Sequence, residues 1–418
     1  MSDVRASQQV TSPAIPGAIP DDGSARGVPF LVLLFLLSIA ILGQAVLIEP
    51  APIDVVLTIL GVVLIILGLR LSFIGLAAGI VYLGLSGVPL ILNHVSSTYA
   101  GRYFIIESYL IFSCLVLYSM LTRWPTTQRL LVRWIARAAA IGSTLILALH
   151  FLTVAPLWLY RSGVRFRLKG AFEDPNVLGP FLILPILYFL ECEKGWRRLW
   201  AVPPLFLLFL TYSRGAWVAI GVSITVLVFG RRILRVGSAT RAILLLVGVA
   251  ALAMALLQFT GVGDDVSTSF ERRARYQQYD DRRFDILAES VNVGLNNPMG
   301  LGAGEFLKEY GLSAHDLFLG KVVDAGVIPA LMLVSLVFLA MIRLLQACRR
   351  YGDQISFVLL ATLCGQIATS LTIYSHHWRH LWVIVVIALA RTHTLLKQNH
   401  SETAAVPATS DTTVRPGV

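Results

Sequence analysis

Apolar runs alternate with short polar or basic stretches along most of the chain, from residue 28 to residue 396. A helix needs roughly 20 mostly apolar residues to cross a bilayer, and many of these runs approach that length. Twelve spans are expected, at residues 28–48, 53–69, 71–91, 104–121, 138–160, 177–191, 201–213, 215–229, 241–258, 319–342, 354–373 and 381–396. The pattern therefore predicts an all-α, polytopic membrane bundle.

The two ends of the chain differ from the region between them. Residues 1–27 and 397–418 are polar and lack long apolar runs, so both are predicted to be disordered tails. No cationic stretch followed by a cleavable apolar core opens the chain, so no signal peptide is expected. Residues 28–396 are predicted to form one transmembrane domain.

Basic residues collect in alternate connections between the expected spans. These residues are Arg70, Arg123, Arg129, Arg133, Arg137, Lys194, Arg197, Arg198, Arg231, Arg232, Arg235, Arg241, Arg349 and Arg350. With twelve spans they all lie on one side of the membrane, and the positive-inside rule makes that side cytoplasmic. Both tails are then expected in the cytoplasm.

The longest polar segment, residues 259–318, is expected to form a long extracytoplasmic loop. Four of its apolar residues recur at helical spacing, namely Phe284, Leu287, Val291 and Leu295. They predict an amphipathic helix that lies on the membrane or on the bundle and ends at Asn296-Asn297-Pro298. The glycines that follow allow the backbone to pass close to a ligand, and these are Gly300, Gly302 and Gly304.

Composition agrees with a membrane protein, because only 14% of the residues are charged and 56% are hydrophobic. Soluble proteins carry roughly 25% charged residues. The net charge of +10 is attributed to cytoplasmic loops, so no nucleic-acid partner is expected. The four cysteines lack the spacing of a zinc site and lie outside the long loop, so no metal centre, disulfide or cysteine nucleophile is expected.

One extracytoplasmic connection breaks the charge rule. It carries four cations against two acids, and the cations are Arg161, Arg165, Arg167 and Lys169. Arg167 and Lys169 are candidates to grip an anionic glycan or a diphosphate, while contact with lipid head groups is an equal alternative. Asp174 is expected to form a turn and helix entry, and Asn176 is a candidate to line the site.

Four motifs appear in order between about residues 165 and 345. They are Gly170-Ala-Phe-Glu-Asp-Pro-Asn176-Val-Leu-Gly, Thr211-Tyr-Ser-Arg214-Gly-Ala, Arg283-Phe-Asp-Ile-Leu running into Asn297-Pro-Met-Gly-Leu-Gly-Ala-Gly304, and His315-Asp-Leu-Phe-Leu followed by Asp324-Ala-Gly326-Val-Ile-Pro. Together these motifs resemble the bacterial O-antigen ligase and O-antigen polymerase superfamily of membrane glycosyltransferases.

The resemblance implies transfer of a glycan from undecaprenyl diphosphate to an acceptor hydroxyl, at the periplasmic face of the bacterial inner membrane. It implies an inverting reaction without a metal, cofactor or nucleotide sugar. The acceptor is a second lipid-linked repeat in a polymerase or the lipid A core in a ligase, and the resemblance implies other polysaccharide assembly proteins and membrane lipids as partners. Asp316 stands where the family usually has Asn, which favours polymerase or exopolysaccharide work over ligase work.

Arg214 and Arg283 match the family's functional arginines, and guanidinium groups suit a diphosphate because they are planar and always charged. Arg282 is a second candidate for the same role. The structural alternatives are an interfacial arginine for Arg214 and an ion pair with Asp280 or Asp281 for the two others. Function is favoured for Arg283, and the ion pair for Arg282.

His315 matches the family's functional histidine and is expected either to accept the proton of the acceptor hydroxyl or to orient the acceptor. A helix-cap histidine beside Asp316 is the structural alternative. Gly302 and Gly304 are candidates to contact substrate. The cluster His376-His377-Trp378-Arg379-His380 is interpreted as an aromatic and basic anchor at the membrane interface, in preference to a metal site.

A lipid-linked glycan flippase or polysaccharide transporter is the alternative from another functional class. It would favour charged residues buried within the spans and inverted repeats. The expected spans are nearly free of charge and no internal repeat is visible, so the transferase is preferred.

Overall fold

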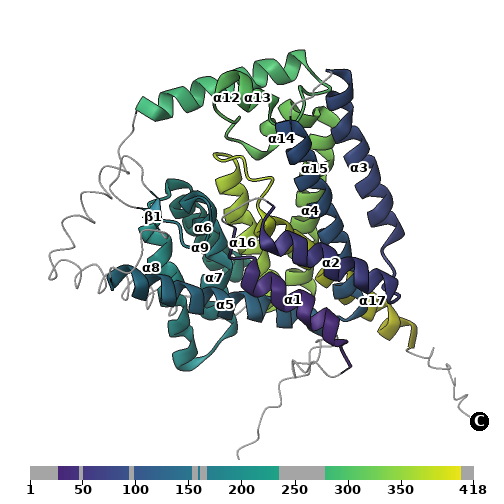
Figure 1. The fold of residues 1–418 in the computed structure, drawn as a ribbon. Helices are drawn as coiled ribbons and strands as arrows, with labels where there is room; N and C mark the ends of the chain where they lie inside the picture. Colours follow the sequence, from purple (N-terminus) through teal and green to yellow (C-terminus); the bar gives the residue numbers. More distant parts are fainter. Residues whose placement is uncertain are drawn as a thin grey trace, which may run out of the picture.

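The structure is a computed structural model that describes residues 27–46, 50–93, 98–152, 159–160, 167–234 and 278–405. Helices dominate it, and one two-stranded antiparallel pairing joins β1 (Leu159–Tyr160) to β2 (Arg167–Leu168). Figure 1 shows that most of the helices gather in one bundle, while α12 lies across one end of it. The all-α class expected from the sequence is confirmed.

The described helices up to residue 234 are α1 Phe30–Leu42, α2 Pro52–Ile66, α3 Phe73–Leu92, α4 Thr98–Arg123, α5 Thr126–Phe151, α6 Pro175–Phe181, α7 Ile183–Cys192, the 3-10 helix η2 Gly195–Ala201, α8 Val202–Leu210 and α9 Arg214–Leu234. The later helices are α12 Gln278–Asn296, α13 Glu305–Tyr310, α14 Leu317–Ala325, α15 Val327–Tyr351, α16 Gln354–Ser370 and α17 Arg379–Ala405.

Six helices of the described residues are long and apolar enough to cross a membrane, by length and composition. They begin with Phe73–Leu92, Ala100–Arg123 and Thr126–Phe151, and continue with Pro175–Cys192, Val327–Tyr351 and Arg379–Lys397. Four more apolar helices are shorter, at Phe30–Leu42, Pro52–Ile66, Arg214–Gly230 and Gln354–Ser370. The count of twelve spans is not confirmed, and the expected span at 241–258 lies outside the described residues.

The span expected at 138–160 differs from its helix at both ends. α5 begins at Thr126 instead of residue 138, because Leu131, Ile135 and Ala139 are buried at helical spacing and continue the packed face of the helix toward its basic end. Helix α5 also ends at Phe151, before the expected end at residue 160. The basic residues expected in a loop therefore lie on the first turns of a helix.

The expected span at 319–342 is also wrong. Gly326 breaks it, with a φ of 94° that side-chain-bearing residues rarely adopt. The short α14 precedes this break and the long α15 follows it. At the other end of the chain α17 continues to Ala405, past the expected tail start at 397.

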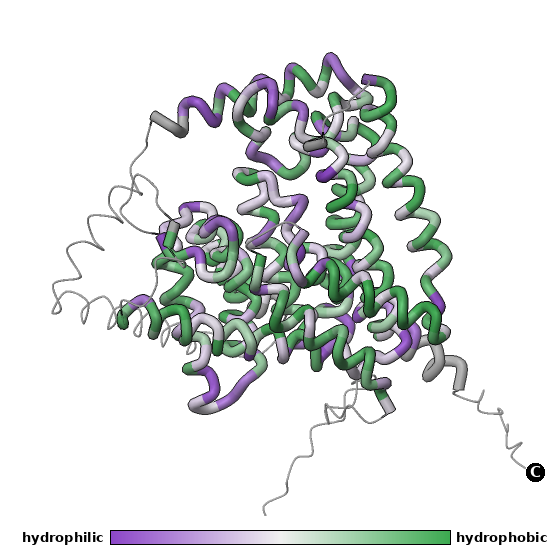
Figure 2. Tube along the Cα trace, in the orientation of Figure 1, coloured by the Kyte–Doolittle hydropathy of each residue, from purple (hydrophilic) through white to green (hydrophobic). Residues whose placement is uncertain are grey.

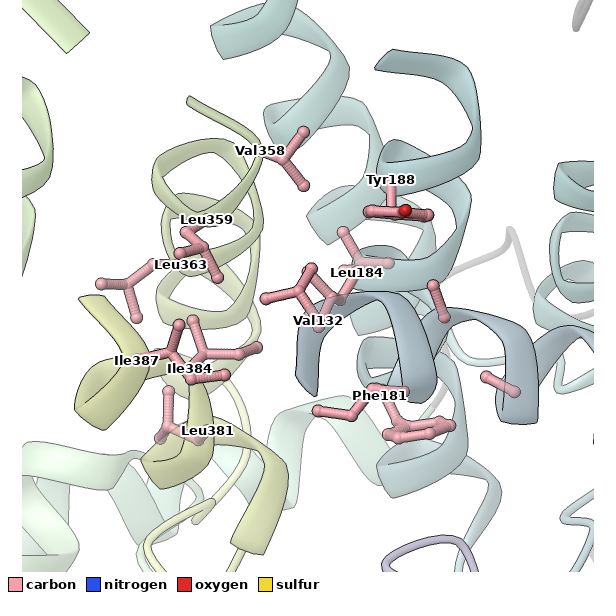
Figure 3. Close-up of a cluster of buried hydrophobic side chains, with 14 of the residues drawn as sticks. Val132, Phe181, Leu184, Tyr188, Val358, Leu359, Leu363, Leu381, Ile384 and Ile387 are labelled. Atoms are coloured by element: carbon pink, nitrogen blue, oxygen red, sulfur yellow. The ribbon is translucent and has the colours of Figure 1, made fainter. Parts of the chain in front are cut away.

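The centre of the bundle is the packing of α16 against α9. A Cβ atom on Gly365 of α16 would lie 2.1 Å from the Ser223 hydroxyl and 2.5 Å from the Ala219 carbonyl oxygen, both on α9. Only glycine permits this approach of two helices. Figure 3 shows the neighbouring apolar cluster, in which side chains such as Val132, Leu184 and Leu363 from different helices meet.

Contacts between distant connections show which helix ends share a side. The Asn93 side chain after α3 donates to the carbonyl oxygens of Gly300 (3.1 Å) and Leu301 (2.9 Å). At the opposite end of α3 and α4, Arg123 donates to the Gly68 carbonyl oxygen at 3.0 Å. In each contact, the charge pattern of the sequence predicts that both segments lie on the same side of the membrane.

Polar residues concentrate in one layer at the end of the bundle that holds Asn93. We call α12, α13, α14 and residues 371–378 the polar layer. Figure 2 shows the hydrophilic stretches of α12 and α13 above helices that are mostly hydrophobic. The long loop expected at 259–318 is therefore helical over much of its described part, and residues 259–277 lie outside the described residues.

Candidate active site

The site is built around residues 369–373, where α16 ends. Arg214 is the first residue of α9. The Thr369 hydroxyl donates to the Gly215 carbonyl oxygen at 3.0 Å, and a Cβ on Gly215 would lie 3.4 Å from Ile373. The start of α9 therefore lies directly against the end of α16.

Arg283 reaches the same segment from a different part of the chain. It lies on α12 and donates through Nη2 to the carbonyl oxygen of Thr372. A Cβ on Gly215, next to Arg214, would lie 3.6 Å from the Thr372 hydroxyl oxygen. The structure thus brings the positions of Arg214 and Arg283 to one short segment, although 69 positions separate them (283 − 214).

His315 lies close enough to Arg283 to be affected by its charge. It precedes α14 and has a φ of 52°, and Tyr212 with a φ of 48° is the other non-glycine residue with positive φ among the described residues. Backbone strain of this kind costs about 1–3 kcal/mol and concentrates at functional sites. Tyr212 lies two residues before Arg214, so both strained residues flank the candidate site.

Burial and, to a smaller extent, the positive charge of nearby Arg283 lower the pKa of His315 to about 4. The imidazole is therefore neutral at neutral pH. A neutral imidazole both donates and accepts a hydrogen bond, which suits the orientation of a hydroxyl group. The influence of Arg283 also shows that the two side chains are electrostatic neighbours.

Asp316 begins α14 as its N-cap. Its Oδ1 accepts hydrogen bonds from the backbone N–H groups of Phe318 and Leu319, both at 2.8 Å. Burial raises the pKa of Asp316, against the effect of these two bonds. The cap is therefore Asp316 and not His315, so the helix-cap alternative for the histidine does not apply.

Arg167 and Asn176 support the turn that leads into Arg214. The Arg167 side chain is only 4% exposed. Its Nε donates to the Thr211 carbonyl oxygen at 2.8 Å, and its Nη2 donates to Asn176 Oδ1 at 2.7 Å. Asp174 caps α6 by accepting from the Asn176 N–H at 2.8 Å, so its expected role as a helix entry is confirmed.

The other cations of this group are placed differently. Lys169 is half-buried in the turn after β2, and its carbonyl oxygen accepts from the Phe172 N–H at 3.1 Å. Arg282 is exposed on α12 and lies beside Gly311. Arg161 and Arg165 lie outside the described residues.

The glycine-rich turn after α12 closes against the end of α14. A Cβ on Gly300 would lie 2.6 Å from the Gly326 nitrogen, so the close approach is to backbone. The Gly302 N–H donates to the Asp324 carbonyl oxygen at 3.0 Å, and the Gly304 N–H donates to Asp324 Oδ1 at 3.2 Å. These contacts tie the glycine-rich turn to the end of α14.

A buried polar network that the sequence analysis missed lies behind this turn. Tyr374 donates to Asp324 Oδ2 at 2.6 Å, and burial raises the pKa of Asp324 to about 6. Lys321 forms an ion pair with Glu107, whose other hydrogen-bond donor is Tyr82 at 2.8 Å. The sequence did contain a signal for this network, because Glu107 and Lys321 both lie inside expected spans. Ionisable residues are costly in a membrane and usually have a function there.

The histidine cluster after α16 lies inside the protein. The rings of His376 and His377 are 3.5 Å apart between centroids, and Tyr103 lies 4.6 Å from His377. Burial lowers the pKa of His377 to about 3, with a smaller effect from Arg379. Arg379 holds Asp54 through two hydrogen bonds, so the cluster is packed in the structure and the expectation of an interface anchor is not tested.

Comparison with known proteins gives a match to a protein family. A family model described as O-antigen ligase matches residues 199–334, a range that contains Arg214, Arg283 and His315. Arg167, Lys169 and Asn176 lie before it. No curated protein matches the chain. The match supports a function in polysaccharide assembly at a membrane, and it confirms the resemblance of this part of the chain to the O-antigen ligase and polymerase superfamily.

Proposed function

We propose that the protein is a glycosyltransferase of the bacterial inner membrane that consumes an undecaprenyl-diphosphate-linked oligosaccharide. The observation that carries the proposal is the approach of Arg214 and Arg283 to residues 369–373, with His315 beside Arg283. Both arginines and the histidine lie within the residues that match the O-antigen ligase family.

The reaction places negative charge on the leaving group. The bond between the anomeric carbon and the diphosphate oxygen breaks, and a new bond forms from that carbon to the acceptor oxygen. Undecaprenyl diphosphate leaves with the bonding electrons, and the proton of the acceptor hydroxyl passes to solvent water or, in the alternative role, to His315. Arg214 and Arg283 are assigned to the diphosphate, where preorganised donors contribute about 3–4 kcal/mol each.

His315 is assigned to the acceptor hydroxyl. With a pKa of about 4 its imidazole is a weak base, so hydrogen bonding that orients the hydroxyl is the favoured role. Direct proton acceptance is the alternative. Arg167 and Asn176 are proposed to act indirectly, because they hold the Thr211 carbonyl and the turn before Arg214.

Polymerisation is preferred over ligation because Asp316 replaces the Asn that is usual in the family. Deletion of the gene followed by gel separation of surface glycans distinguishes the two. A polymerase mutant retains a single repeat on the lipid A core. A ligase mutant leaves an unmodified core, while long polymer stays on its lipid carrier.

The central test replaces Arg214 or Arg283 by Ala in the full chain. We expect loss of long glycan chains while the amount of protein in the membrane is unchanged. Lys308→Ala is the matched control, since Lys308 is an exposed cation of the polar layer that pairs with Glu305 at 3.0 Å. Normal glycan ladders from both arginine variants would refute the proposal.

The orientation of the site is part of the proposal. Both ends of the chain are placed in the cytoplasm and the polar layer in the periplasm, following the positive-inside rule. An alkaline phosphatase reporter fused near Gly302 should be active, because this enzyme folds only outside the cytoplasm. An inactive phosphatase together with a fluorescent cytoplasmic reporter at the same position would overturn the orientation.

Transport is the second candidate, because Lys321 and Glu107 form a buried ion pair and Glu107 lies within α4. Buried charges in spans often mark transport pathways. The two functions separate in detergent, where purified protein cannot transport across a bilayer. Transfer of glycan between lipid carriers in detergent supports the transferase, and its absence alongside movement of lipid-linked glycan in vesicles supports the transporter.

A further inference from the structure

Helix α12 presents three different faces. The side chains of Ile286, Ser290 and Val293 are 8%, 0% and 7% exposed and pack on the protein. A second face carries the apolar residues expected from the sequence, and Phe284, Val291 and Leu295 on it are 61%, 42% and 77% exposed. The third face is polar and exposed, at Asp281, Asp285, Asn292 and Asn296.

The spacing of these residues separates the faces around the helix axis. At about 100° per residue, Phe284, Val291 and Leu295 fall within a narrow sector. Ile286 and Val293 fall on a different sector, and Asn292 and Asn296 on a third. The helix therefore has more apolar surface than its packing on the protein uses.

The depth of α12 follows from α3. This helix is one of the six apolar enough to span a membrane, and it ends at Leu92. The next residue, Asn93, bonds to the carbonyl oxygens of Gly300 and Leu301, a few residues after α12 ends. The last turn of α12 therefore lies at the level where an apolar span ends. In Figure 1 α12 lies crosswise to α3 and α15 at this level.

The exposed apolar surface of α12 continues into that of a spanning helix. The Val327 N–H, at the start of α15, donates to the Pro298 carbonyl oxygen at 2.9 Å. Met299 beside it is 60% exposed. On α15 itself Ile328 and Leu331 are 56% and 59% exposed, as expected for the lipid-facing side of a span. One apolar surface thus runs from α15 through Met299 to Leu295.

We propose that α12 is an interfacial helix, and that the face formed by Phe284, Leu287, Val291 and Leu295 inserts into the outer edge of the lipid bilayer. The partner is the apolar part of the bilayer and not a charged head group, because the polar face of α12 carries acids. Insertion is therefore expected in zwitterionic as well as anionic lipid.

The insertion gives Arg283 a fixed depth. Arg283 lies one residue before Phe284 and bonds to the Thr372 carbonyl oxygen, so it is held between lipid and bundle. If the protein has the proposed transferase function, this places its guanidinium at the level of a diphosphate attached to a membrane lipid. That consequence rests on the proposed function, whereas the insertion itself does not.

The experiment labels single cysteines on α12 with an environment-sensitive fluorophore, in the full chain reconstituted in phosphatidylcholine nanodiscs. The native Cys114, Cys192, Cys348 and Cys364 are first replaced by Ser or Ala. Leu295→Cys tests the apolar face. Asn292→Cys is the matched control, because it lies three residues away on the exposed polar face.

We expect the label at position 295 to emit at shorter wavelength and to lose at least half of its intensity with brominated lipids. The label at 292 should respond to aqueous iodide instead. Equal quenching of both labels by iodide would overturn the proposal, because the apolar face would then lie in water. Protection of 295 from both quenchers would also overturn it, and would indicate a cover of protein, such as a second copy. The readout needs no glycan transfer, so it can fail independently of the proposed function.

Discussion

The packing of α16 on α9 and the polar layer of α12 to α14 hold their backbones together by different means. In the first, a glycine lets two helices touch, and a Cβ on Gly365 would overlap Ser223 and Ala219. In the second, single polar side chains bridge segments that are distant in sequence, as Asp324 bridges Gly304 and Tyr374. The contact of α16 with α9 is thus sensitive to added volume, whereas the polar layer, which also has a tight backbone contact at Gly300 and Gly326, is sensitive in addition to the loss of one polar group.

Gly365→Leu should have the largest effect. A Cβ at position 365 would already lie 2.1 Å and 2.5 Å from atoms of α9, so a leucine side chain forces the two helices apart. We expect loss of folded protein, measured as membrane level and as a monodisperse peak after detergent extraction. Gly221→Leu is the control, because a Cβ on Gly221 of α9 meets nothing within 4 Å. Normal yield of the Gly365 variant would contradict the proposed close packing.

Glu107→Gln should come next, since it leaves the charge of Lys321 buried without its partner. Breaking a buried pair in this way costs about 3–5 kcal/mol. Thermal unfolding in detergent should show a large drop in Tm. The double variant Glu107→Leu with Lys321→Met should recover most of it, and a double variant no more stable than the single one would mean that the pair is not the source of the effect.

Arg283→Lys tests whether the planar guanidinium group is needed at this position, because the variant keeps the positive charge. Lysine keeps the positive charge but cannot hold Thr372 and a diphosphate with a planar group. We expect a rate of glycan transfer about tenfold to a hundredfold below the wild type, with an unchanged Tm. Arg282→Lys, at the neighbouring exposed position, should stay near the wild-type rate. Equal losses of transfer rate in the two variants would contradict the assignment of the diphosphate to Arg283 in preference to Arg282.

His315 gives a pH prediction. Its folded pKa of about 4 lies below the unfolded value of about 6.5, so the unfolded chain binds the extra proton first. Stability should therefore fall as the pH drops from about 6.5 toward 4. His315→Gln should flatten this part of the curve and, if the histidine only orients the acceptor, keep more activity than His315→Ala. Equal activity losses for Gln and Ala would favour proton acceptance.

Asp316 should show the smallest effect. Asp316→Ala removes the cap of α14 and costs about 1 kcal/mol of stability, whereas Asp316→Asn keeps the cap. Denaturation in detergent measures both. The Asn variant also carries the residue usual in the family, so a change in its glycan products without a change in stability would link this position to acceptor choice.

Much of the fold was predictable because it depends on local patterns. The amphipathic helix at residues 284–295 is confirmed as part of α12, since helical spacing of apolar residues is a local property. The sequence shows a glycine at position 326, where the helix breaks, but the apolar residues continue on both sides of it, so the break was not predicted. The predicted start of α5 was wrong because a cluster of basic residues is found in loops and also in the first turns of helices.

For the candidate site, the motifs of the sequence named Arg214, Arg283 and His315. They did not indicate that the end of α16 joins the two arginines, or that Glu107 pairs with Lys321 across 214 positions (321 − 107). The excess of cations before the first motif proposed contact with a glycan, a diphosphate or lipid head groups for Arg167, whose side chain the structure places against Thr211 and Asn176.

The sequence by itself determined that this protein is helical and apolar, where its polar segments lie, and which short motifs it shares with a known family. Only the tertiary structure decided which of those segments meet, which face of α12 is buried, and which charges are paired. The physical reason is that hydrophobic periodicity shows which face of each helix is apolar. Which helices pack together depends on how well the surfaces of segments distant in the chain fit one another. Two helices with the same pattern can meet different partners.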